Sequence, residues 1–164
     1  VRRFETALMW DGAILSRGSK QIILSAIKDY IHHFKSFFKH DIDYFQLLKQ
    51  QNITRYRPIN HLCIRFNGIE IFEDVVCCIF AAILCGNQPY ISMNVPDDVK
   101  KKLLTVLELL NIKLELFDQT DAEFKSSLLK LVNTDTPKSL IFISCATKFA
   151  AFRASNPFCK CTVA

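Results

Sequence analysis

The sequence predicts an α/β fold with a mostly parallel sheet, flanking helices and a preceding N-terminal helical segment. Beyond Pro58, short apolar segments typical of strands alternate with helical segments of roughly 11 to 16 residues. Parallel strands require such helical crossovers between them. Half of the 164 residues are hydrophobic and 14 are Phe, which excludes disorder for most of the length. A chain of this size suits one core with an appendage.

Residues 1–57 are predicted to form an N-terminal helical linker segment. Ser19 is the expected N-cap of a long amphipathic helix, and a second short helix is expected at residues 42–49. Apolar residues follow the cap at three- and four-residue spacing: Ile23, Ile27, Tyr30, Ile31, Phe34, Phe37 and Phe38. This stripe either packs on the body of the domain or faces another domain or subunit, and stripes of this kind are more often buried within the same fold.

Residues 58–164 are predicted to form a Rossmann-like α/β domain. Strands are expected at residues 61–66, 90–94, 112–117 and 139–144, and helices at 72–85, 97–110 and 121–132. The helix after Pro96 begins with two acids, which favour a helix N-terminus, and Asn111 is expected to close it. Its inward face is expected to hold Leu103, Leu104, Val106, Leu107 and Leu110.

Composition limits the compartment and the partners. The longest apolar run, residues 75–85, is far shorter than the roughly 18 residues of a membrane span, and the N-terminus lacks a signal-peptide core. Basic residues are dispersed among acids despite a net charge of +5, so no nucleic-acid partner is expected. The seven cysteines indicate a cytoplasmic protein without disulfides, because four lie in apolar runs as small hydrophobes: Cys63, Cys77, Cys78 and Cys85.

No phosphate-binding loop is present. The chain has only four glycines and contains neither G-x-G-x-x-G nor G-x-x-x-x-G-K-[ST]. Its first strand-to-helix turn, NGIEIFED, holds the single glycine Gly68 together with Glu70, Glu73 and Asp74. Acids near a helix N-terminus stabilise the helix dipole but repel a pyrophosphate. We therefore expect this chain alone to bind no dinucleotide.

The histidines and cysteines form no convincing ligand set. His33 and His40 are seven residues apart and could share a helix face, but His32 points elsewhere and His61 is isolated. Cys77 and Cys78 lack the adjacent base that a thiolate nucleophile needs. The tail Cys159-Lys160-Cys161 is a single C-x-C without a second cysteine pair. It could capture a metal ion or hold a thiol of lowered pKa, but we favour the interpretation that it has neither role.

Arg55 and Arg57 flank Tyr56 just before the sheet begins. The two guanidinium groups could bind an anion. Alternatively they pair with carboxylates while Tyr56 packs the connecting segment on the body, and we favour this second interpretation.

The stretch QNITRYRPINHLCIRF, followed by FEDVVCCIFAAILCGNQPYISMN, resembles the C-terminal part of proline utilization A. In that family an asparagine-containing segment and a proline lead into an apolar strand, then a helix rich in Leu and Ala and a glycine turn. The corresponding positions are Asn52, Arg55, Tyr56, Pro58, 62–66, Ala81, Ala82, Gly86 and Asn87. The resemblance covers residues 51–110, and the first fifty residues resemble linker helices.

The same resemblance implies a degenerate NAD-binding fold. The aldehyde dehydrogenase lysine that helps hold NAD falls at Ser92, and the proline after it falls at Met93. The Pro-Trp-Asn segment of active aldehyde dehydrogenases falls at Asn67, Gly68 and Ile69. Ile69 therefore stands where the asparagine of those enzymes would stabilise an oxyanion. No cysteine lies in the Gly-Gln-x-Cys context of the nucleophile. The resemblance thus implies no catalytic, cofactor-binding or metal-binding residue in this segment.

The parent implied by the resemblance oxidises proline with FAD and then oxidises glutamate γ-semialdehyde, formed from 1-pyrroline-5-carboxylate, with NAD. It would be a cytoplasmic oxidoreductase, compatible with a homo-oligomer and with peripheral contact at the inner membrane. This segment would cover the active sites or the channel between them, with the parent's catalytic domains as partner. Interface candidates are Tyr30, Phe34, Phe37, Phe38, Arg55, Tyr56 and Arg57. The alternative is a free-standing Rossmann-like interaction module.

Overall fold

The structure is a computed structural model that describes residues 14–59, 61–132 and 140–143. Its helices are α2 (Arg17–His33), the π-helical η1 (Phe34–Phe38), α3 (Phe72–Leu84), α4 (Asp97–Leu109) and α5 (Asp121–Val132). Its strands are β1 (Ile42–Asp43), β2 (Ile53–Thr54), β3 (His61–Phe66), β4 (Tyr90–Met93), β5 (Leu116–Asp118) and β6 (Leu140–Ile143). The prediction of a mixed α/β fold is confirmed.

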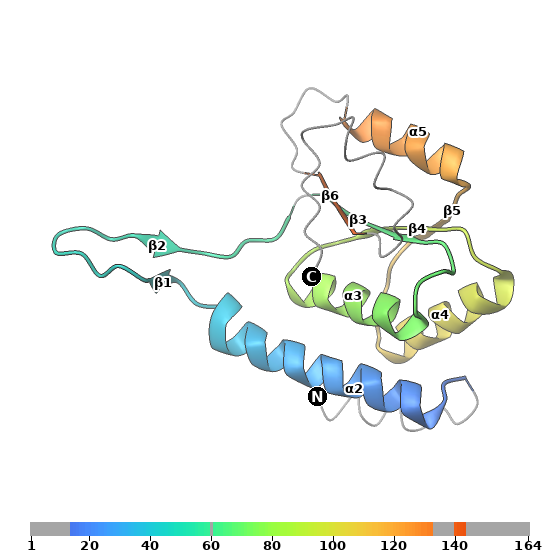
Figure 1. The fold of residues 1–164 in the computed structure, drawn as a ribbon, viewed down its shortest axis with the longest axis horizontal. Coiled ribbons are helices and arrows are strands. Elements are labelled where there is room, and N and C mark those ends of the chain that lie inside the picture. Colours follow the sequence, from blue (N-terminus) through green and yellow to red (C-terminus); the bar gives the residue numbers. More distant parts are fainter. Residues whose placement is uncertain (1–13, 60, 133–139, 144–164) are drawn as a thin grey trace.

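The central sheet has the strand order β5-β4-β3-β6, and all three neighbouring pairs are parallel. The chain first moves from β3 through β4 to β5, and then crosses back over the sheet to β6. Crossovers between parallel strands are right-handed, so this reversal of direction places the connecting helix on the opposite face. Accordingly, α3 and α4 cover one face and α5 covers the other (Figure 1).

The two faces of β3 differ in character because successive side chains of a strand point to opposite sides. Leu62, Ile64 and Phe66 belong to the large apolar core under α3 and α4. Cys63 belongs to a small second cluster with Phe124 and Leu128 of α5. The apolar core of the described residues therefore lies mainly on the α3 side of the sheet.

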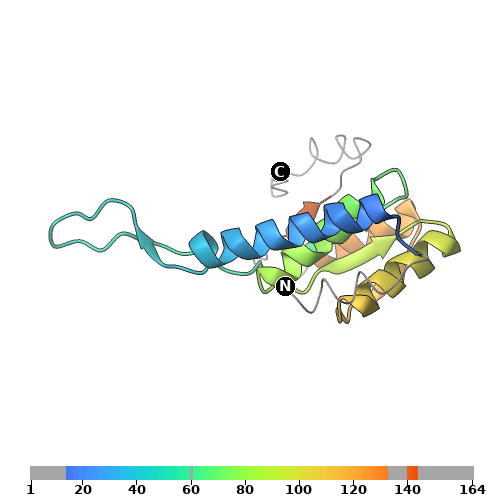
Figure 2. The same cartoon turned by 90° about the horizontal axis from the view of Figure 1, so that it is seen from below.

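Helix α2 lies on α3 as a further layer (Figures 1 and 2). Ile23 and Ile27 are fully buried and join the same core as the sheet. The first half of the predicted stripe is therefore core, as the commoner interpretation expected. The N-cap prediction was wrong, because Ser16 caps α2 by accepting a hydrogen bond from the Ser19 N–H at 3.0 Å.

An arm of residues 39–58 projects from the body (Figure 1). The predicted helix at residues 42–49 is wrong: β1 and β2 pair there as an antiparallel hairpin. The reason is local, because the Asp43 carboxylate accepts hydrogen bonds from the backbone N–H groups of Phe45, Gln46 and Asn52. A side chain that bonds its own backbone in this way competes with helix formation.

Two further expectations need correction. The strand predicted at residues 112–117 is shorter and later, since only Leu116–Asp118 pairs with β4. Ile112 instead helps to close α4, because its N–H donates to the Leu107 carbonyl at 2.8 Å. Asn111, the residue before it, has a positive φ of 55°. Leu104 was expected inside but is 40% exposed. The closing role of Asn111 was predicted correctly, since α4 ends at Leu109, Leu110 is its C-cap and Asn111 follows with a positive φ.

Candidate functional site

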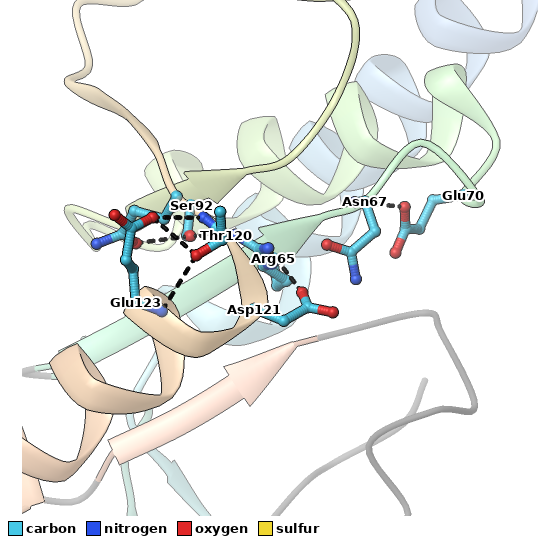
Figure 3. A network of polar contacts seen from close by, with 8 residues as sticks. Arg65, Asn67, Glu70, Ser92, Thr120, Asp121 and Glu123 are labelled. Carbon is cyan, nitrogen blue, oxygen red and sulfur yellow. Dashed lines mark hydrogen bonds and ion pairs between the residues drawn. The ribbon is translucent and has the colours of Figure 1, made fainter.

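A polar network lies between the carboxyl ends of the central strands and α5 (Figure 3). Arg65 on β3 is 1% exposed and donates from Nη1 to the Ser92 hydroxyl at 2.6 Å. Its Nη2 donates to the Asp121 carboxylate at 2.8 Å, and its guanidinium carbon lies 4.9 Å from the centre of the Phe124 ring. Burial of a charge is costly unless it is paired in this manner.

The network continues away from Arg65. Ser92 donates to Gln119 Oε1 at 2.7 Å, and Gln119 donates to the Ser127 hydroxyl at 3.2 Å. No role was predicted for Arg65 from the sequence. A signal existed, because Arg65 and Ser92 are polar residues in two buried strands and become direct neighbours in the parallel register. Only the register reveals that they meet.

The turn after β3 is occupied by the protein's own carboxylate. Glu70 accepts a hydrogen bond from the Asn67 N–H at 2.9 Å (Figure 3). Glu73 and Asp74 follow in the first turn of α3. The Ser19 hydroxyl donates to Glu73, and this hydrogen bond holds the pKa of that carboxyl below its ordinary value. A carboxylate of the chain thus takes a backbone N–H in the turn where a dinucleotide-binding fold holds a pyrophosphate, and two more acids follow in the first turn of the next helix.

The Gly86-Asn87 turn has a structural role. Gly86 follows the end of α3 with φ 80°, and an added Cβ there would lie 3.1 Å from Pro58 Cγ. Buried Asn87 accepts a hydrogen bond from the Ile59 N–H at 2.6 Å and donates to the Ala82 carbonyl at 3.1 Å. This turn therefore fastens the chain that enters β3 to the end of α3.

The seven interface candidates divide into two groups. Tyr30 packs against the main core and Phe34 is half-buried. The other five are exposed and lie in η1 or near the base of the arm: Phe37, Phe38, Arg55, Tyr56 and Arg57. Phe38 and Tyr56 form an edge-to-face pair with centroids 4.8 Å apart, which joins η1 to the arm. Exposed aromatic side chains thus gather where the arm leaves the body.

Arg55 pairs with Asp41 across the arm, and Arg55 Nε donates to Asp41 Oδ1 at 2.6 Å. The hydrogen bond from Arg55 lowers the pKa of the Asp41 carboxyl from its ordinary value. This pairing confirms for Arg55 the interpretation favoured from the sequence. Tyr56 packs on Phe38 of η1.

The remaining titratable candidates do not converge. The described part of the chain contains no group of three or more His, Cys, Asp or Glu side chains arranged to hold a metal ion. Cys63 and Cys77 are buried, and burial raises the pKa of their thiols to about 12 and about 11. Cys78 is only half-buried and Cys85 is exposed. The expectation that these two cysteines lie in the apolar interior was therefore wrong. The Cys159-Lys160-Cys161 tail lies outside the described residues.

Comparison with protein-family models, with curated proteins and with solved structures gives no significant match. Among the helices that the structure describes, none is both long and apolar enough to span a lipid bilayer. The geometry of the described residues is therefore the basis for a functional interpretation.

Proposed function

We propose that this chain is a non-catalytic docking domain of a proline utilization A-type enzyme, which converts proline to glutamate through 1-pyrroline-5-carboxylate. One observation carries the proposal: the Glu70 carboxylate accepts the Asn67 N–H of the β3–α3 turn, and two further acids, Glu73 and Asp74, follow in the first turn of α3. A pyrophosphate placed there would meet negative charge instead of free N–H donors.

The finer fold class belongs to the same proposal. In the order β5-β4-β3-β6 the first strand of the sheet is central, and the chain reverses direction beside it. This arrangement is typical of one half of a doubly wound, Rossmann-like sheet. We infer that the fold is Rossmann-like with its cofactor site closed. Ser92 supports this inference, because its hydroxyl is buried and engaged by Arg65 and Gln119 at the position aligned with the NAD-binding lysine.

The docking surface is the exposed aromatic group at the base of the arm. Phe37 is 53% exposed and precedes Phe38, whose ring pairs edge-to-face with Tyr56. Aromatic side chains with a neighbouring arginine are enriched at protein interfaces. The partner is the catalytic region of the parent enzyme, which would supply FAD, NAD and the catalytic cysteine.

The test is complementation. Calorimetric titration of the purified chain with NAD is expected to give no binding heat. Mixing the chain with a catalytic region that lacks this segment is expected to restore semialdehyde oxidation. Binding of NAD by this chain alone would contradict the closed cofactor site, and failure of the mixture to gain activity would contradict the docking role.

A matched pair of variants tests the surface. Phe37→Ser removes an aromatic side chain from the proposed interface and should weaken complementation by tenfold or more, on the order of 1.4 kcal/mol or above. Leu129→Ser changes a side chain of similar exposure, 48%, on α5 and should leave complementation unchanged. The alternative, a free-standing interaction module, predicts a stable chain whose aromatic surface binds a different protein and gives no complementation.

A further inference from the structure

Asn67 and Gly68 lie in the turn that joins β3 to α3, and no other asparagine of the sequence precedes a glycine. Asparagine is among the thermally labile residues of proteins. Its side chain is lost when the backbone nitrogen of the next residue attacks the side-chain amide carbon. Glycine permits this attack best, because it has no Cβ to shield that nitrogen. The pair is therefore chemically suited to spontaneous modification.

The structure leaves both reacting groups free of hydrogen bonds within the part of the chain that it describes. Gly68 is exposed, and its N–H donates to no group of the described residues. The amide oxygen of Asn67 accepts no hydrogen bond there either. Cyclisation requires loss of the N–H proton and rotation of the amide onto the next nitrogen, and a hydrogen bond to either group would oppose it. No such bond restrains this pair.

Other asparagines of the described residues are protected. The side-chain amide of Asn87 is buried and makes hydrogen bonds through both its oxygen and its nitrogen. After Asn111 the next N–H, that of Ile112, is already donated to the Leu107 carbonyl at 2.8 Å. Asn67 is accordingly expected to react first.

The products of this reaction fit the turn poorly. The Asn67 N–H donates to one oxygen of Glu70 at 2.9 Å (Figure 3), and the other oxygen of Glu70 is buried without a partner in the described structure. A new carboxylate on residue 67 would lie beside Glu70, and like charges repel. A longer backbone would also disturb Gly68, which has φ 77° and where an added Cβ would lie 3.5 Å from Val95 Cγ1.

We propose that Asn67-Gly68 is a deamidation site and that its conversion loosens the β3–α3 turn. The deprotonated Gly68 nitrogen bonds to the side-chain amide carbon of Asn67, ammonia leaves, and a succinimide ring forms. Water then opens the ring. Attack at the side-chain carbonyl gives aspartate, and attack at the backbone carbonyl gives isoaspartate. The net reaction consumes water and releases ammonia, so it needs no enzyme or cofactor, and it is independent of the proposed docking function.

Incubation of the full chain in mildly alkaline buffer, followed by peptide mass spectrometry, tests the site. The mass gain that marks deamidation should be complete at Asn67 before it is detectable at any other asparagine. Asn67→Gln should lose this gain, because glutamine must form a larger ring. The matched control is Asn52→Gln, which changes an exposed asparagine followed by Ile53 and should leave conversion at Asn67 unchanged. Conversion of another asparagine first, or at the same rate, would overturn the assigned site.

Urea denaturation measures the effect on the turn. Asn67→Asp introduces the new charge directly and should raise the equilibrium constant for unfolding by about fivefold or more, as should conversion in the incubated chain. Gln88→Glu makes the same change of charge at an exposed position and should alter that constant by no more than about twofold. Equal stability of Asn67→Asp and the native chain would overturn the proposed loosening.

Discussion

Individual side chains decide how the pieces of this protein are joined. Asn87 shows this, because its amide bridges the last turn of α3 and the Ile59 N–H just before β3. Asp43 does the same for the arm by accepting three backbone N–H groups. Both are short polar side chains that replace missing backbone partners, and such groups are costly to lose when the backbone group is buried.

Replacement of Gly86 by Ala should destabilise the protein. The residue has φ 80°, and a Cβ would lie 3.1 Å from Pro58 Cγ. We expect a loss of about 1 to 2 kcal/mol in the free energy of unfolding, measured by urea denaturation. Gly18→Ala is the control: it lies in α2, its Cβ would be 3.8 Å from Ser16 Oγ, and helix propensity predicts a gain of about 0.5 to 1 kcal/mol. Equal effects at both sites would contradict the strained turn.

The Asp41–Arg55 pair should titrate at acidic pH. The hydrogen bond from Arg55 lowers the pKa of Asp41 in the folded state below the ordinary value of 3.8. The contribution of the pair to folding stability is therefore fully present above pH 3.8 and is lost as the pH falls through the folded-state pKa. Carboxyl titration followed by NMR should show a higher Asp41 pKa in Arg55→Gln than in the native chain. An unchanged pKa in that variant would show that the ion pair does not form in solution.

At the scale of elements, α2 combines two roles along its length. Its central residues are buried against α3, whereas the exposed aromatics come after its last turn, in η1. Periodicity in the sequence showed a single continuous stripe, because the spacing of apolar residues is the same in both halves. Where the stripe stops being core depends on where the body beneath it ends.

Neighbouring residues of α2 provide a matched test of this division. Ile23→Ala empties a fully buried position and should cost about 2 to 5 kcal/mol of unfolding free energy. Ile22→Ala changes a side chain that is 56% exposed and should alter stability by no more than about 0.5 kcal/mol. Urea denaturation of both variants measures the difference. A negligible effect of Ile23→Ala would mean that α2 is a detachable interface helix.

At the scale of the whole molecule, the first segment and the α/β body share one hydrophobic core in the described residues. A domain boundary at residue 57 was predicted from the sequence because the periodicity changes beyond Pro58. Contacts between Ile23 or Ile27 and the body are distant in the sequence, so no local pattern could reveal them. The arm, rather than α2, is the element that stands apart (Figures 1 and 2).

A shared core predicts that α2 and the sheet unfold together. Urea unfolding should show one transition when followed by far-ultraviolet circular dichroism and by alkylation of Cys77, which lies in the common core. Two separated transitions, with helix signal lost before Cys77 becomes reactive, would instead indicate that the N-terminal helix is an independent segment.

By itself, the sequence determined the α/β class, the positions of β3, α3, β4, α4 and α5, and the absence of a glycine-rich phosphate loop. These features depend on local periodicity, helix-end residues and glycine positions, which a linear pattern records. Only the tertiary structure decided that Arg65 meets Ser92 and Asp121 between the sheet and α5, and that the Asp43 side chain holds the arm together. Strand register and crossover direction bring those residues together, and both arise from packing between segments far apart in the chain.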